Sequence, residues 1–141
     1  MAVEARVLDA SVLAKCFIEE AGSAVARRRV LMQLDWTAPD LIFLEIANVL
    51  IKALRRNAIE LAAAQRAVSG LPALLATAVA SSELHERAFA LAIAHGFSAY
   101  DASYLALAER EQTRVLTADR KLAERSQAVG LGALVDLLQT A

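Results

Sequence analysis

Two patterns of apolar and polar residues alternate along the chain. Short apolar runs without helical spacing predict buried strands, because both faces of a strand in a parallel sheet are covered. Longer segments whose polar residues recur every three or four positions predict helices. The predicted strands cover residues 5–9, 73–80, 114–117 and 131–138, and the predicted helices cover residues 11–19, 24–34, 41–56, 60–68, 82–95, 99–110 and 120–129.

Residues that disfavour helical backbone mark the boundaries between these elements. The segment from Trp36 to Pro39 should end the second helix, and Asp40 is placed to cap the third. Gly70 and Pro72 should end the fourth helix, and Gly96 the fifth. No internal repeat interrupts this order.

The alternation of strands with helices predicts an α/β fold in which an open parallel sheet is covered by helices on both faces. A chain of 141 residues is long enough to bury one substantial core, so residues 1–141 are predicted to form a single domain. Ligands of such folds bind outside the carboxyl ends of the strands, and functional residues are expected there.

Composition narrows the class of protein further. With 57% hydrophobic and 22% charged residues, the chain is predicted to be globular rather than disordered. A net charge of −1 gives no overall field for nucleic acid, so any anionic partner must be held by local cations. The single cysteine, Cys16, lies in an apolar run and reads as a small buried hydrophobe, which fits a reducing cytosol.

No segment of the sequence predicts a membrane span or a signal peptide. The longest stretch without charge, residues 67–82, is too short to cross a bilayer and contains Gly70 and Pro72. The first residues lack the order of charge, apolar segment and cleavage site that exported proteins carry. We therefore expect a cytoplasmic protein.

Four acidic residues interrupt apolar surroundings. Asp9 and Asp119 follow predicted strands, Asp101 begins an apolar helix, and Glu45 lies in a polar stripe on helix 41–56. Buried carboxylates need a compensating cation, and without cysteine or histidine nearby the donor set suits Mg²⁺ or Mn²⁺ rather than zinc. Each acid also has a structural explanation: Asp9 and Asp119 could cap helices, Asp101 fits a capping box with Ser98, and Glu45 could be solvated.

The segments around these acids resemble the PIN-domain proteins, and specifically the VapC-type toxin ribonucleases of toxin–antitoxin pairs. The likeness spans nearly the whole chain. It is carried by residues 7–13 (VLDASVL), 38–50 (APDLIFLEIANVL), 100–108 (YDASYLALA) and 116–119 (LTAD), in this order and spacing. A departure is Cys16, where relatives often have an aromatic residue; this bears on packing more than on chemistry.

The resemblance implies a three-layer α/β/α sandwich with a central parallel sheet of four to five strands, and a metal-dependent endoribonuclease that uses Mg²⁺ or Mn²⁺. Asp9, Glu45, Asp101 and Asp119 match the acidic cluster of the family, with Asp9 and Asp101 as the principal ligands. Three further residues match positions that orient carboxylates or hold water: Asn48, Thr117 and Ser11.

RNA phosphates need local cations, and the candidates are Lys52, Arg55, Arg56 and Arg120, with residues 27–29 and Lys121 as further possibilities. These cations could equally form a solvated face or contact an antitoxin. The resemblance implies a VapB-type antitoxin, which we expect to insert an arginine among the carboxylates, and the high apolar fraction predicts a homodimer. The aromatic residues, Tyr104 among them, are expected mostly in the core, and His85 and His95 are not expected to act in catalysis.

Two other functions remain open at this stage. A PIN fold could serve only as a protein-binding module, although four converging acids argue against that interpretation. A haloacid-dehalogenase-like phosphatase also carries an aspartate after its first strand, but it needs a second aspartate two residues later, where this chain has Ser11.

Overall fold

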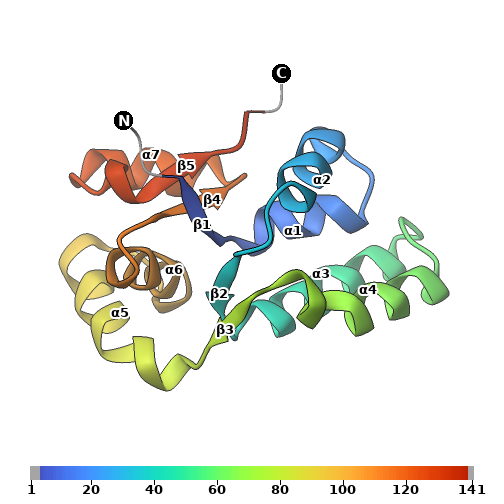
Figure 1. The fold of residues 1–141 in the computed structure, drawn as a ribbon, viewed down its shortest axis with the longest axis horizontal. Helices are drawn as coiled ribbons and strands as arrows, with labels where there is room; N and C mark the ends of the chain where they lie inside the picture. Colours follow the sequence, from blue (N-terminus) through green and yellow to red (C-terminus); the bar gives the residue numbers. More distant parts are fainter. Residues whose placement is uncertain (1–3, 140–141) are drawn as a thin grey trace.

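The computed structural model describes residues 4–139 as a parallel sheet between two layers of helices (Figure 1). The sheet has five strands in the order β3-β2-β1-β4-β5, and every neighbouring pair is parallel. This arrangement confirms the predicted α/β/α architecture. The strands are β1 (Ala5–Leu8), β2 (Thr37–Pro39), β3 (Thr77–Val79), β4 (Arg114–Thr117) and β5 (Val135–Leu137).

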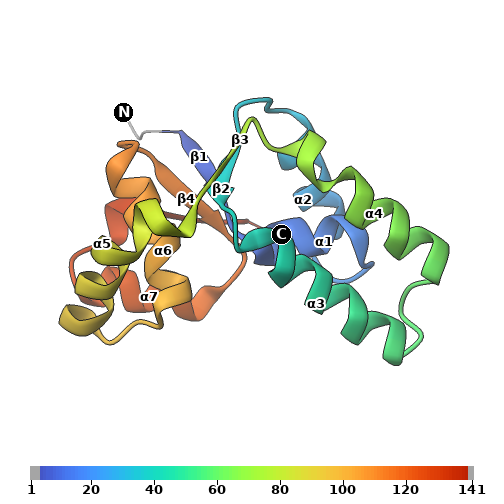
Figure 2. The same cartoon turned by 90° about the horizontal axis from the view of Figure 1, so that it is seen from below.

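The helices divide between the two faces of the sheet in the order in which they occur along the chain. Four of them pack on one face and three on the other, and the strands pass between the two groups (Figure 2). The first group is α1 (Ala10–Phe17), α2 (Ser23–Leu31), α3 (Ile42–Arg55) and α4 (Leu61–Leu74). The second is α5 (Ser81–His95), α6 (Ala99–Arg110) and α7 (Arg120–Ala128), and a 3₁₀ turn at Gly132–Leu134 leads into β5.

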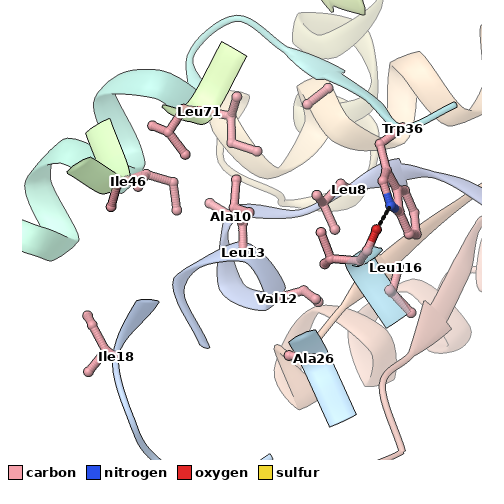
Figure 3. Packing of buried hydrophobic residues seen from close by; sticks show 14 of the residues in the cluster. Leu8, Ala10, Val12, Leu13, Ile18, Ala26, Trp36, Ile46, Leu71 and Leu116 are labelled. Carbon is pink, nitrogen blue, oxygen red and sulfur yellow. Dashed lines mark hydrogen bonds between the residues drawn. The ribbon is translucent and has the colours of Figure 1, made fainter. Parts of the chain in front are cut away.

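Two hydrophobic cores follow from the alternation of side chains along the central strands. Leu8 and Leu116 point into the core beneath α1–α4, whereas their neighbours Val7 and Val115 point into the core beneath α5–α7. Trp36 fills the first core, and its indole Nε1 donates a hydrogen bond of 3.0 Å to the carbonyl of Val30 (Figure 3). The central strands are thus fixed from both sides.

One strand was not predicted. Residues 37–39 were interpreted only as a break between helices, yet they form β2 between β1 and β3. A three-residue strand that ends in proline shows no alternation to detect. Pro39 is tolerated because β1 pairs with β2 only at Thr37, so the missing N–H of Pro39 interrupts no bond to β1.

Two predicted helix boundaries were wrong. Helix α4 continues through Gly70 and Pro72 to Leu74. Leu71 is buried in the core, and a proline in the last turns removes only one backbone hydrogen bond, so packing outweighs its cost. Asp40 does not cap α3, which begins one residue after Leu41; its Oδ1 instead accepts a hydrogen bond from Ser81.

The remaining boundaries agree with the sequence to within a few residues. Gly96 ends α5 in the left-handed conformation, with φ of 78°, as predicted. In the part of the chain that the structure describes, no helix is long and apolar enough to cross a membrane.

Candidate active site

The order of the strands predicts a ligand site between β1 and β4. From β1 the chain builds outwards to β2 and β3, and then returns to add β4 and β5 on the other side. Such a reversal makes neighbouring connections diverge at the carboxyl ends of the strands, where open α/β sheets bind their ligands. Asp9 directly follows β1, and Asp119 lies two residues after the end of β4. The amide of Asp9 donates to the carbonyl of Leu116 at 3.0 Å, which ties the two strand ends together.

The carboxylate of Asp9 is buried and held by two hydroxyl groups. Ser11 Oγ and Thr117 Oγ1 both donate to Oδ2 of Asp9, at 2.5 and 2.7 Å. Ser11 Oγ accepts the amide of Ala118, and Thr117 Oγ1 accepts that of Asp119, so the backbone that follows β4 orients both hydroxyls. Oδ1 receives no hydrogen bond from the described residues. One oxygen is therefore fixed and the other remains available to a ligand.

Glu45 lies in the first turn of α3, close enough to Asp9 for their charges to interact. Its Oε1 accepts a hydrogen bond of 2.6 Å from the phenol of Tyr104, which is fully buried in α6. Burial raises the pKa of Glu45 to about 7; the bond from Tyr104 opposes this rise, and the charges of Asp9 and Asp101 add to it. Burial also raises the pKa of Tyr104, which keeps the phenol a donor.

Helix ends place the two remaining acids. Ser98 caps α6 by accepting the amide of Asp101 at 3.1 Å, which is one half of the predicted capping box; among the described residues, the Asp101 carboxylate does not accept the Ser98 amide in return. Asp119 caps α7, as the sequence also suggested, since its Oδ1 accepts the amide of Leu122 at 3.2 Å. That hydrogen bond uses one oxygen of Asp119 and leaves the other free. The Asp101 carboxylate takes no part in its cap, and the Asp119 carboxylate uses only one oxygen in its own, so both side chains can also bind a ligand.

The acids influence one another electrostatically. The pKa of Asp9 is raised by burial, against the two hydroxyl donors, and further by the charges of Asp101 and Asp119. Burial raises the pKa of Asp101 as well, Asp119 adds to the rise, and Arg125 opposes it. Among the described residues, no salt bridge involves any of the four acids. The cluster therefore stores negative charge that an added cation would neutralise.

The donor chemistry of this cluster fits a hard divalent cation. Carboxylate oxygens are the ligands that Mg²⁺ and Mn²⁺ prefer, and Mg²⁺ commonly keeps several waters while it contacts one or two carboxylates. Within residues 4–139, no group of three or more His, Cys, Asp or Glu side chains is arranged to hold a metal ion as the side chains stand. The acids therefore offer suitable ligands without a closed coordination shell.

The other predicted site residues lie at different distances from this cluster. Asn48 is exposed on α3, one turn after Glu45. Lys52, Arg55 and Arg56 are also exposed, further along the same helix. At 1.5 Å per residue, Arg55 lies about 15 Å from Glu45 along the helix axis. Arg120 is exposed directly beside Asp119, so it is the nearest of the predicted cations to the acids by chain position.

Two residues near the candidate site, Tyr104 and Arg125, could not be assigned to it from the sequence. Tyr104 was interpreted as core; it is buried, but its hydroxyl also contacts Glu45. A detectable signal was its position three residues after Asp101, which places both side chains on neighbouring parts of one helix face. Arg125 was not singled out, yet its charge acts on Asp101 while its guanidinium donates to the carbonyl of Gly96 and lies 5.2 Å from the ring centre of Phe97.

Comparisons with known proteins show what the sequence and the fold resemble. The family model described as PIN domain matches residues 6–127. The chain is 37% identical over 125 residues to a protein named Ribonuclease VapC3 from Pyrobaculum aerophilum, covering 87% of this chain and 95% of that protein.

Two solved structures have a similar fold. The crystal structure of PAE2754 from Pyrobaculum aerophilum matches with a TM-score of 0.70 and 25% identity, over 96% of this chain and 92% of the other. VapC20 of Mycobacterium tuberculosis, described as a toxin that cleaves the sarcin-ricin loop, matches with a TM-score of 0.65 and 16% identity, over 84% of this chain and 92% of the other.

Proposed function

The chain belongs to the PIN-domain family, and from this premise we propose that it is a VapC-type toxin ribonuclease that hydrolyses RNA phosphodiester bonds with Mg²⁺ or Mn²⁺. The observation that supports the proposal is that Asp9, Glu45, Asp101 and Asp119 lie close enough to act on one another's charges, near the carboxyl ends of β1 and β4. Three of these acids have raised pKa values, partly because the others are close. A structural role alone does not require four acids on four different elements.

We assign Asp9 and Asp101 as the principal ligands, with Glu45 and Asp119 completing the cluster. Asp9 would bind through Oδ1, because Ser11 and Thr117 occupy Oδ2. A divalent cation held there supplies charge for the phosphate and lowers the pKa of an attacking water. Ser11 and Thr117 keep the Asp9 carboxylate in one orientation, and this costs little because helix α1 already fixes Ser11 and strand β4 already fixes Thr117.

Cations near the cluster would hold the RNA backbone. Arg120 lies beside Asp119 at the start of α7, and Lys121 follows it; both are exposed. Their charges would offset the repulsion between the acids and the phosphates that flank the cleaved bond. Lys52, Arg55 and Arg56 lie along α3 and would contact more distant nucleotides or a protein partner.

The proposal extends to partners and compartment. We propose that a VapB-type antitoxin inhibits the enzyme by placing an arginine among the four acids, because a guanidinium would satisfy the same uncompensated charge as a metal. We also propose a cytoplasmic homodimer built from the single domain of residues 1–141. Large apolar side chains on α5 support self-association: Phe89 and Ile93 are 66% and 73% exposed.

The proposal is tested by cleavage of a mixed RNA pool with purified, antitoxin-free protein in EDTA, Mg²⁺ or Mn²⁺. Wild type should cut only with metal, and Asp9→Asn should not cut. Asp35→Asn is the matched control, because Asp35 is exposed and precedes β2. It therefore lies at the amino ends of the strands, away from the candidate site at their carboxyl ends. Cleavage by Asp9→Asn at the rate of the control would refute the site, and metal binding without cleavage of any RNA would favour a protein-binding role.

A further inference from the structure

The phenol of Tyr104 lies where three elements of the candidate site meet. Its ring belongs to α6 and is 1% exposed, and its hydroxyl donates to Oε1 of Glu45 on α3 at 2.6 Å. The backbone of Ala10, the residue after Asp9, also lies near the phenol, where it opposes the rise in the pKa of Tyr104 that burial and the charges of Asp9 and Glu45 cause. The hydroxyl therefore contacts Glu45 directly and lies close enough to Asp9 for their charges to interact, and Tyr104 follows Asp101 by one helical turn.

Glu45 depends on an external contact for its orientation. A glutamate side chain has three rotatable bonds, so its carboxylate samples many positions unless something holds it. Among the described residues, the hydrogen bond from Tyr104 is the only side-chain contact of this kind that Glu45 makes. A tyrosine has fewer rotatable bonds, and the ring of Tyr104 is fixed by the core that contains Leu105 and Val7. The rigid partner thus determines where the flexible one lies.

We propose that Tyr104 is a positioning residue of the nuclease, whose hydroxyl holds the Glu45 carboxylate in the orientation that binds the divalent cation. This inference rests on the proposed function. A competing interpretation is that Tyr104 only fills the core, in which case its hydroxyl could be lost without effect on metal binding. Both interpretations place the ring of Tyr104 in the core. They differ in whether its hydroxyl affects metal binding.

The first test compares Tyr104→Phe with wild type in Mn²⁺ binding, followed by the loss of the electron paramagnetic resonance signal of free Mn²⁺. Phenylalanine keeps the ring and removes only the hydroxyl. We expect the Kd for Mn²⁺ to rise about tenfold, as for other residues that orient metal ligands. The Mn²⁺ concentration for half-maximal RNA cleavage should rise equally, with little change in kcat at saturating metal. Tyr100→Phe is the control, because Tyr100 lies on the same helix and is 68% exposed.

A second variant shows whether the effect passes through Glu45. Glu45→Asp keeps the charge but shortens the side chain by one methylene, which withdraws the carboxylate from the phenol. Alone it should raise the Kd for Mn²⁺ about tenfold, and adding Tyr104→Phe should raise it by no more than about twofold further, since the contact is already lost. Equal effects of Tyr104→Phe in both backgrounds would overturn the inference.

The outcomes separate this inference from the proposed function. If wild type neither binds Mn²⁺ nor cuts RNA, the proposed function fails and this inference fails with it. If wild type does both while Tyr104→Phe matches Tyr100→Phe, only the positioning role of Tyr104 is refuted. Thermal unfolding of each variant checks that the fold persists, and Glu45→Asp, which leaves the buried ring intact, tests the contact if Tyr104→Phe does not fold.

Discussion

Replacing Glu45 by glutamine should stabilise the metal-free protein at neutral and alkaline pH. Glutamine has the shape of the protonated carboxyl and still offers an oxygen to Tyr104. Burial raises the pKa of Glu45 from 4.5 to about 7, despite the bond from Tyr104, with help from Asp9 and Asp101. Because the folded state holds the proton more tightly than the unfolded chain, the wild type is favoured below pH 4.5 and loses that stability as the pH rises through 7.

The size of the effect follows from the shift. At 1.36 kcal/mol per pKa unit, a rise from 4.5 to about 7 corresponds to roughly 3 kcal/mol of unfolding free energy. Glu45 is only partly buried, and solvent screening reduces this to about 1–2 kcal/mol. For a domain of this size, the melting temperature of Glu45→Gln should exceed that of wild type by about 3–8 °C at pH 8.

The assay is thermal unfolding in EDTA between pH 4 and pH 8.5. The curves of wild type and Glu45→Gln should meet near pH 4 and separate as the pH rises. Glu86→Gln is the control, because Glu86 is exposed on α5. Saturating Mg²⁺ should narrow the gap, since it binds the wild-type carboxylate in the folded state. Parallel curves, or a gap that is largest at low pH, would refute the electrostatic reasoning.

Three further predictions test other parts of the structure. Thr117→Val removes one of the two donors to Asp9 and should raise the Kd for Mn²⁺ about tenfold, measured by calorimetry; an unchanged Kd would exclude a role in orienting Asp9. Arg120→Ala should reduce the slope of log K for RNA binding against log salt concentration by about one, measured by filter binding. Arg56→Ala should reduce this slope less, because Arg56 lies further from the acids. A larger effect of Arg56→Ala would place the RNA along α3. Gly96→Ala should destabilise the protein by about 1 kcal/mol in urea because φ is 78°, while Gly70→Ala in exposed helix should stabilise it; equal shifts would contradict the backbone argument.

Most of the secondary structure could be predicted from local signals. Strand β4 at Arg114–Thr117 and helix α6 at Ala99–Arg110 agree with the sequence prediction, because a short apolar run and a capping residue determine them locally. Strand β2 could not be found in this way. Its three residues are a strand only because β1 and β3 flank them, and pairing with distant segments leaves no pattern in the residues themselves.

Part of the candidate site could likewise be predicted from local features of the sequence, and part could not. Asp9 and Asp119 could be located because an acid after a buried strand is a local feature, and Asp101 because it follows a capping serine. The contact between Tyr104 and Glu45 joins residues 59 positions apart, and no spacing rule connects them. The end of helix α4 could not be predicted either. Pro72 disfavours helical backbone, but the burial of Leu71 outweighs this cost and the helix continues to Leu74.

The hydrogen bonds of Asp9 also determine when the site can form during synthesis. Thr117 is separated from Asp9 by 108 positions, and its hydroxyl is one of the two that hold the Asp9 carboxylate. Asp119 and strand β4 leave the ribosome after every other acid of the cluster. A growing chain that has already folded α1–α4 therefore still lacks one wall of the candidate site. On the proposed function, such a nuclease would become active only late in translation, when the proposed antitoxin, made alongside it, would already be present to bind it.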